Sequence, residues 1–180
     1  MLIQDIINKK EKEDNYIASL GAKLTGLRKD GIKRSLFDCN ESEHRLEYVG
    51  KVRDVEFIND SRSTNVTSTW IALEKMDRPL IWIAGGVDNG NDYYILKEIV
   101  KDKVDAIICL GKENSRLHKS FAGMVKKIVD TTNATDAVRL AFQLSKPGYT
   151  VILSPACPSF DLFESYEDRG RQFKKAVKEL

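Results

Sequence analysis

Short apolar runs alternate with segments of helical spacing along most of the chain. From residue 55 onward, strands are expected at residues 55–58, 80–84, 106–110, 127–129 and 150–153. Between and after them, helices are expected at residues 66–76, 93–100, 115–121, 134–144 and 171–179. Strands that are apolar throughout and are separated by helices are typical of a parallel sheet covered on both faces. The pattern predicts an α/β, Rossmann-like domain with a mostly parallel sheet flanked by helices.

The chain before residue 55 follows a different pattern. Residues 2–7 are expected to form a short strand, and residues 14–27 and 31–37 two helices. The polar stretch 41–45 then begins the domain, and residues 46–52 are expected to pair with the strand at 55–58 as a hairpin. We therefore expect a division into residues 1–40 and 41–180.

Composition and charge exclude several classes of function. The 180 residues include 29 Lys and Arg and 27 Asp and Glu, so no strongly basic face supports nucleic-acid binding. The N-terminus resembles neither a signal peptide nor a membrane span, which predicts a cytoplasmic protein without a membrane partner. Cys39, Cys109 and Cys157 are widely spaced; the last two are expected to be buried reduced thiols, and no Cys/His cluster indicates zinc.

Four polar or glycine-rich loops follow expected strands, and crossover topology places them at one edge of the sheet. They occupy residues 59–65, 85–92, 111–114 and 154–163. A polar run before a helix suits a phosphate or a carboxylate, because unpaired N–H groups point outward there. The alternative for the first loop is a simple helix cap by Thr64 or Asn65.

The last loop also has a structural interpretation. It can be an ordinary strand-to-helix connection, stiffened by Pro155 and Pro158, in which Ser159 and Asp161 cap the following turn. The glycine loop at 85–92 is not a phosphate-binding Walker loop, because no Gly-Lys-Ser/Thr follows it.

Two histidines lie outside these loops. A His-Arg pair such as His44-Arg45 is more often a solvated face than a site, and His118, beside Lys119, is expected on the surface of a helix.

Four motifs in this order resemble the Mur ligase family, in its D-glutamate-adding branch. They are His44-Arg45-Leu46-Glu47, Asp60-Ser61-Arg62-Ser63-Thr64-Asn65, Gly85-Gly86-Val87-Asp88-Asn89-Gly90-Asn91-Asp92 and Ser154-Pro155-Ala156-Cys157-Pro158-Ser159-Phe160-Asp161. The resemblance implies that residues 1–40 are a remnant of the family's central domain and residues 41–180 its C-terminal domain. The family uses ATP and magnesium to form an acyl phosphate on UDP-N-acetylmuramoyl-L-alanine, which the amine of D-glutamate then attacks, in peptidoglycan precursor synthesis.

The resemblance also implies roles for individual residues. D-glutamate would be bound by Thr64, Asn89, Ser159, Phe160 and Tyr166. The nucleotide and its phosphates would face a second set of side chains: Asn15, His44, Arg45, Asp60, Ser61 and Arg62.

The chain departs from the family pattern where Arg62 and Asn89 replace lysines and where Pro158 replaces a small residue. A charge-assisted hydrogen bond is worth about 1.5–3 kcal/mol, so the loss of the lysine charge at Asn89 predicts weak D-glutamate binding.

No Gly-Lys-Thr loop and no set of magnesium ligands occurs in the sequence, and no catalytic or metal-binding residue is assigned. The resemblance thus implies part of an ATP-dependent ligase that is inactive alone and holds neither ATP nor magnesium tightly. The alternatives are a stand-alone, non-catalytic module for an acidic amino acid or a nucleotide, and an interaction protein without a small ligand. The apolar stripe of residues 17–27 is expected to pack on the main domain or on a second copy, as in a homodimer.

Overall fold

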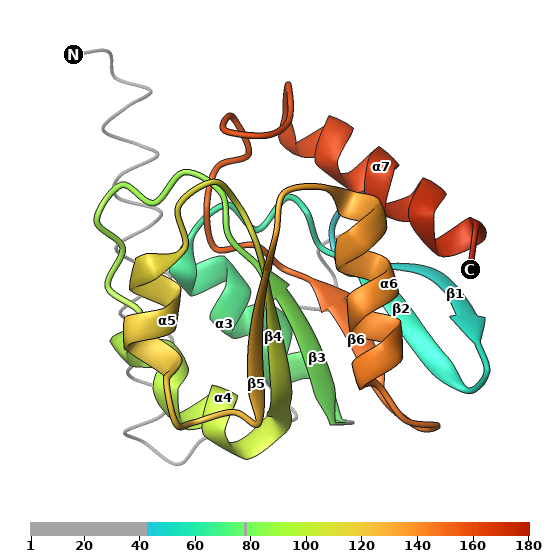
Figure 1. Ribbon diagram of the computed structural model, residues 1–180, viewed down its shortest axis with the longest axis horizontal. Helices are drawn as coiled ribbons and strands as arrows, with labels where there is room; N and C mark the ends of the chain where they lie inside the picture. The colour runs from blue at the N-terminus through green and yellow to red at the C-terminus, as the bar shows by residue number, and fades with distance from the viewer. Residues whose placement is uncertain (1–42, 78) are drawn as a thin grey trace, which may run out of the picture. The chain divides into compact units, whose positions relative to one another are not determined.

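The computed structural model describes residues 43–77 and 79–180, which belong to one unit spanning Glu41–Leu180 (Figure 1). The strands of this part are β1 (Glu47–Val52), β2 (Val55–Asn59), β3 (Leu80–Ala84), β4 (Val104–Leu110), β5 (Lys127–Thr131) and β6 (Thr150–Leu153). The helices are α3 (Val66–Lys75), the 3-10 turn η1 (Tyr94–Leu96), α4 (Lys97–Lys103), α5 (Ser115–Phe121), α6 (Ala134–Leu144) and α7 (Tyr166–Lys178). Several predictions for residues 1–40 lie outside the described residues: the strand, both helices, the apolar stripe, Asn15 and Cys39.

The strands form one sheet in the order β1-β2-β6-β3-β4-β5. Only β1 is antiparallel to its neighbour, so the predicted hairpin and the mostly parallel α/β sheet are both confirmed. The last strand, β6, lies between β2 and β3: Val151 pairs with both Phe57 and Ile81. Because parallel strands end at the same edge, the loops after β2, β6 and β3 become neighbours.

Two apolar layers cover the sheet. Side chains alternate between its faces along each strand. Ile81 and Ile83 belong to one apolar cluster with residues of α6 and α7, whereas Trp82 belongs to the other, with residues of α3, α4 and α5. In Figure 1, α6 and α7 lie on one side of the sheet and α3, α4 and α5 on the other. Complete burial of a large apolar side chain stabilises a fold by about 1.5–3 kcal/mol, and all three of these side chains are fully buried. The core thus holds the strand ends, and the loops that follow them, in fixed positions.

The final helix begins earlier than expected. The prediction that it starts at Arg171 is wrong, because α7 begins at Tyr166. The side chain of Ser165 accepts a hydrogen bond from the backbone N–H of Asp168, which caps the helix, and the acidic residues of the first turn favour its positive end. The extra turn directs Arg169 and Gly170 into the interior.

The other boundaries differ less. The helix expected at residues 93–100 is replaced by η1 followed by α4, and β4 and β5 are each two residues longer than predicted. Across residues 43–77 and 79–180, no helix combines the length and the apolar character that crossing a bilayer requires.

Candidate functional site at the carboxyl edge of the sheet

The four loops meet at the carboxyl edge of the sheet, as predicted. The backbone N–H of Ala156 donates to the carbonyl of Ser63 at 3.0 Å, and that of Val87 to the carbonyl of Pro158 at 2.9 Å. The loop after β4 joins them through the N–H of Lys112, which donates to Oδ2 of Asp161 at 3.0 Å. Backbone bonds therefore fix the relative positions of loops that lie far apart in the sequence.

Gly86 and Ala156 show how tightly these loops pack. A Cβ atom on Gly86, whose φ is +129°, would lie 2.1 Å from the carbonyl oxygen of Pro158, so only glycine fits there. Ala156 adopts a φ of +61°, a conformation that L-residues rarely take and that concentrates at ligand-binding loops.

Arg169 connects three of the four loops, and the sequence analysis assigned it no role. Its guanidinium is 1% exposed and donates to Oγ and O of Ser61, at 3.0 and 2.9 Å. It also donates to the carbonyls of Cys157 at 3.1 Å and of Gly85 at 3.4 Å. Burial lowers its pKa to about 10, so the side chain remains charged at neutral pH. The Ser165 cap, with Glu167 and Asp168 after it, was the sequence signal that could have placed Arg169 on a helix.

Unpaired polar atoms collect between the loops after β4 and β6. Oγ of Ser159, Oδ1 of Asn114 and Oδ1 of Asp161 are buried without a hydrogen-bond partner among the described residues. Each such atom costs about 1–3 kcal/mol unless a ligand or water satisfies it. Gly111 permits this crowding, since a Cβ there would lie 2.7 Å from Oδ1 of Asn114. The arrangement is suited to a polar ligand.

The prediction that Ser159 and Asp161 cap the following turn with their side chains is wrong. The backbone carbonyl of Ser159 accepts the bonds from Leu162 and Phe163, and Asp161 accepts from Lys112. In the first loop Asn65, rather than Thr64, caps α3, by accepting from the N–H of Ser68 at 2.8 Å.

The other residues that the resemblance assigned to D-glutamate surround this edge. Thr64 is half-buried beside the start of α3, and Asn89 is exposed on the glycine loop. Phe160 is 73% exposed, an unusual position for a phenylalanine. Tyr166 begins α7, and its carbonyl accepts from Oγ of Ser61 at 2.8 Å.

Three of the residues expected on the nucleotide side are buried. His44 is 3% exposed, Asp60 1% and Ser61 0%. The expectation that His44 lies on a solvated face is wrong, because its ring packs against Gly170 and its Nδ1 accepts from Nδ2 of Asn59 at 2.9 Å. Burial lowers the pKa of His44. The side chains of His44 and Ser61 are not open to a nucleotide in this structure, whereas Asp60, although almost fully buried, lines the pocket described below.

Asp60 is a buried carboxyl group that links β1, β2 and β6. Its Oδ2 accepts from Oγ of Ser154 at 2.7 Å, and its Oδ1 from the backbone N–H of Leu46 at 3.2 Å. Burial raises its pKa to about 6, and these hydrogen bonds limit the rise.

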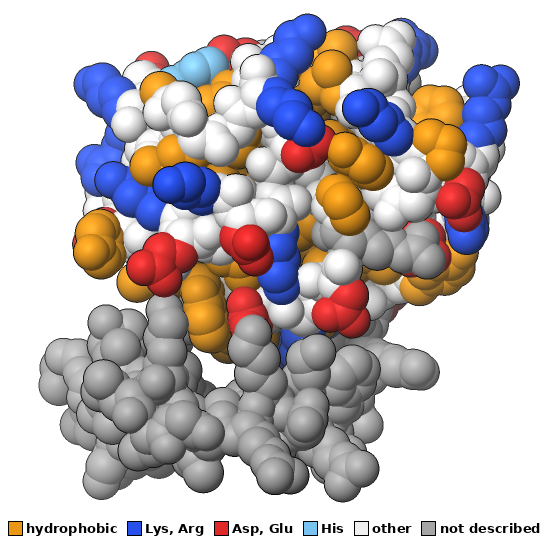
Figure 2. All heavy atoms as spheres, turned by 90° about the horizontal axis from the view of Figure 1, so that it is seen from below, with side chains coloured by type: hydrophobic (Ala, Val, Ile, Leu, Met, Phe, Trp, Pro, Cys, Tyr) orange, Lys and Arg blue, Asp and Glu red, His pale blue; other side chains and the backbone are white. Residues whose placement is uncertain are grey.

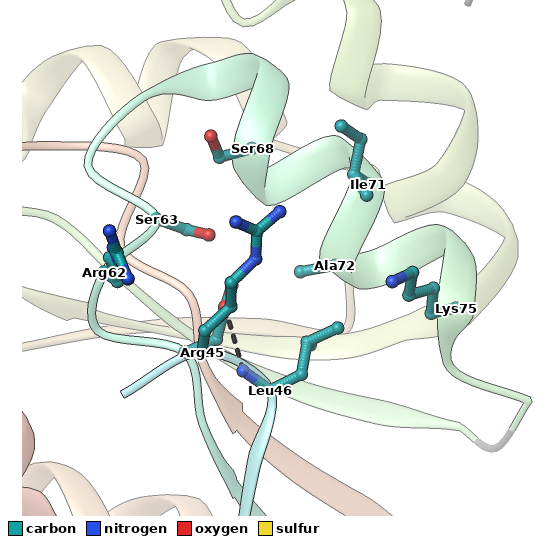
Figure 3. Close-up of a pocket in the computed structure, with 9 residues that line it drawn as sticks. Arg45, Leu46, Arg62, Ser63, Ser68, Ile71, Ala72 and Lys75 are labelled. Carbon is teal, nitrogen blue, oxygen red and sulfur yellow. Dashed lines mark hydrogen bonds between the residues drawn. The ribbon is translucent and has the colours of Figure 1, made fainter. Parts of the chain in front are cut away.

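A cationic pocket of about 140 Å³ lies between the start of β1, the first loop and α3. Figure 3 shows Arg45 extending across it towards α3, with Lys75 on the helix wall and Arg62 on the loop. The hydroxyls of Ser63 and Ser68 also line it. Of the residues assigned to the nucleotide side, Arg45 and Arg62 are thus exposed and can meet an anion.

Away from these loops the surface carries both signs of charge. Seen from below, Lys and Arg side chains are interspersed with Asp and Glu (Figure 2). This mixture agrees with the formal net charge of +2.

Sequence comparison places the chain among known proteins. Residues 44–157 match the model of the glutamate ligase domain of Mur ligases. The chain is 50% identical over 163 residues to a UDP-N-acetylmuramoylalanine--D-glutamate ligase of Christiangramia forsetii, covering 91% of this chain and 37% of that protein. It is 48% identical over 168 residues to the ligase of the same name from Bacteroides fragilis, covering 93% and 38%. The chain thus spans less than two-fifths of these relatives' length.

Solved structures share the fold at low sequence identity. A bifunctional folylpolyglutamate synthase/dihydrofolate synthase from Yersinia pestis superimposes with a TM-score of 0.54 and 14% identity, over 79% of this chain and 32% of that one. A UDP-N-acetylmuramate-alanine ligase from Thermotoga maritima gives 0.52 and 11%, over 92% and 36%.

Proposed function

The chain belongs to the Mur ligase family, whose glutamate ligase domain it contains, and from this premise we propose that it holds D-glutamate for amide-bond formation. The enzyme would be a cytoplasmic UDP-N-acetylmuramoylalanine–D-glutamate ligase of peptidoglycan synthesis. This part would position the amine of D-glutamate next to an activated carboxyl group of UDP-N-acetylmuramoyl-L-alanine.

The observation that carries the proposal is the buried, unpaired hydroxyl of Ser159 where the four loops meet. D-glutamate has two carboxylates, which need convergent donors, and an amine, which needs acceptors. Ser159 and Thr64 offer hydroxyl donors, whereas Oδ1 of Asn114 and Oδ1 of Asp161 are acceptors without partners among the described residues. Arg169 acts as a positioning residue, since it fixes the loops on which these groups lie.

Aromatic side chains would complete the site. Phe160 is exposed at its mouth, and Tyr166 lies at the start of α7. Their rings would cover the methylene groups of the ligand and exclude water.

The cationic pocket supports a phosphate-facing role for Arg45 and Arg62. Its volume of about 140 Å³ suits one phosphate-sized group, because pockets for whole ligands occupy roughly 300–1,000 Å³. ATP with magnesium would supply the phosphoryl group that activates the carboxyl. The described residues offer no fitting magnesium site there, because Asp60 is buried with its oxygens bonded to Ser154 and Leu46.

We expect the chain alone to bind D-glutamate weakly and to turn over no ATP. Asn89 is exposed where a cation would strengthen carboxylate binding, so the affinity should lie in the millimolar range, or about −4 kcal/mol.

Isothermal titration of the chain with D-glutamate, L-glutamate and ADP tests the proposal. D-glutamate should bind in preference to L-glutamate. Asn89→Lys should tighten binding, and Ser159→Ala weaken it, each by roughly ten- to a hundredfold, the worth of one charge-assisted hydrogen bond. Ser120→Ala, on α5, is the matched control and should change nothing.

Two results would contradict the proposal. Binding of ADP alone, with neither isomer of glutamate, would favour a stand-alone nucleotide module. Phosphate release from ATP that disappears when residues of this chain are changed would show that the chain is catalytic by itself.

A further inference from the structure

Three side chains with metal-ligating atoms meet beside the loop that follows β4. Sγ of Cys109, a ring nitrogen of His118 and a carboxylate oxygen of Asp130 all lie within 4.8 Å of one another. Nε2 of His118 is 3.0 Å from each carboxylate oxygen of Asp130. No Cys/His spacing in the sequence indicated zinc, because these three residues are far apart along the chain and meet only in the fold.

The fold of the backbone fixes the positions of these three residues, whose side chains are short. Cys109 and Asp130 are directly paired across the parallel strands β4 and β5, so both side chains leave the same face of the sheet. That face is covered by α5, whose Leu117 and Phe121 are buried in the same apolar cluster as Cys109. His118 follows Leu117 on this helix, so its position depends on helix packing.

The geometry points to a Zn²⁺ site formed by Cys109, His118 and Asp130. Zn²⁺ binds thiolate sulfur at about 2.3 Å, and imidazole nitrogen and carboxylate oxygen at about 2.0–2.2 Å. In a tetrahedral shell these ligand atoms lie roughly 3–4 Å apart, so small side-chain rotations would suffice. A thiolate and an imidazole select Zn²⁺ over Mg²⁺ or Ca²⁺, which prefer oxygen ligands.

Solvent can reach the fourth coordination position. Cys109 is fully buried, whereas His118 and Asp130 are 40% and 55% exposed, so an ion would sit between the sulfur and the surface. Sites with three protein ligands commonly complete the shell with water. The ion would join the edge strand β5 and α5 to β4, and so brace the loop at residues 111–114.

The ion pair between His118 and Asp130 by itself adds little to stability. An exposed pair such as His118 and Asp130 contributes only about 0–1 kcal/mol. Zn²⁺ binds sulfur as the thiolate, so the ion would displace the proton of the Cys109 thiol.

Titration of the full chain with Co²⁺, which mimics Zn²⁺ and absorbs light, tests this site. One equivalent should produce a thiolate-to-metal charge-transfer band in the near ultraviolet, and Zn²⁺ should abolish it by displacement. The band should disappear in Cys109→Ser. His118→Ala and Asp130→Asn should each weaken Co²⁺ binding by at least about a hundredfold. Loss of a residue that only hydrogen-bonds to a metal ligand weakens binding by roughly 10- to 100-fold, so a larger loss indicates a direct ligand.

Matched variants separate this site from the other two cysteines. Cys157→Ser and Cys39→Ser should retain the band. If Cys109→Ser fails to fold, His118→Ala still tests the site, because this side chain lies at the surface. Zn²⁺ should then raise the melting temperature of the parent chain but not that of His118→Ala. A missing band at one equivalent, a band that survives Cys109→Ser, or one lost in Cys39→Ser would overturn the assignment.

Discussion

The carboxyl edge of the sheet has two parts that are built in different ways. Around Ser159, the loops are joined by backbone hydrogen bonds and by the buried Arg169, and the polar atoms have fixed positions. Around Arg45 and Arg62, the charges lie at the surface on long side chains. The first part holds its polar groups in a preorganised arrangement, whereas the second would have to order its long side chains before they could hold an anion.

Because of this difference, substitutions in the two parts should have different effects on folding stability and on ligand binding. A buried polar residue that loses its partners costs free energy of unfolding, whereas a surface charge costs little. Substitutions in the Arg169 network should therefore disturb the fold and the proposed glutamate site together. Those in the Arg45 pocket should alter only anion binding.

The largest effect is expected for Arg169→Ala. The substitution leaves Ser61, Gly85 and Cys157 without their donor and should lower the free energy of unfolding by about 4–5 kcal/mol. Urea denaturation measures this change. Arg171→Ala, exposed on the same helix, is the control and should stay within about 0.5 kcal/mol. Similar small effects for both variants would show that the buried network does not hold the loops.

The next effect concerns pH and Asp60. Because its pKa rises from 3.8 to about 6 on folding, the folded state holds the proton more tightly than the unfolded state. This contribution to stability is complete below about pH 4 and is lost as the pH rises through 6. From pH 4 to 7.5, the parent chain should therefore lose up to about 3 kcal/mol relative to Asp60→Asn.

The same denaturation series, run for both chains across this pH range, measures the difference. Asp102→Asn, on the exposed side of α4, is the matched surface control. A difference between parent and Asp60→Asn that does not change with pH would contradict the interpretation of Asp60.

The smallest of the three effects is expected for Gly170→Ala. The new Cβ would lie 2.2 Å from Nδ1 of the buried His44, and such overpacking costs about 1–3 kcal/mol. Alanine recovers about 1 kcal/mol of helix propensity, so we expect a net loss of stability of up to about 2 kcal/mol. Thermal denaturation should show a lower melting temperature for this variant.

Gly50→Ala is the matched control, because a Cβ added there would meet nothing within 4 Å and alanine is the better strand residue. It should leave stability unchanged or raise it slightly. A stabilising Gly170→Ala would mean that His44 can move aside and that this part of the edge is less rigid than the other contacts indicate.

The sequence alone determined the elements and the edge on which the site lies. The strands β3 and β6 and the helices α5 and α6 have the predicted boundaries, because apolar periodicity reports burial locally. Since strands that alternate with helices run parallel, their following loops had to share one edge, and this placed Thr64 and Ser159 together. The resemblance of the family motifs then led to the proposal of D-glutamate as the ligand.

Only the tertiary structure decided which side chains meet. The insertion of β6 between β2 and β3 brings Ser61, Gly85 and Cys157 within reach of Arg169, and no local pattern encodes that strand order. His44 is buried because Gly170 leaves room for its ring, although neither residue is apolar. Cys109, His118 and Asp130 likewise meet through strand pairing and helix packing, which depend on contacts between distant segments rather than on their spacing in the chain.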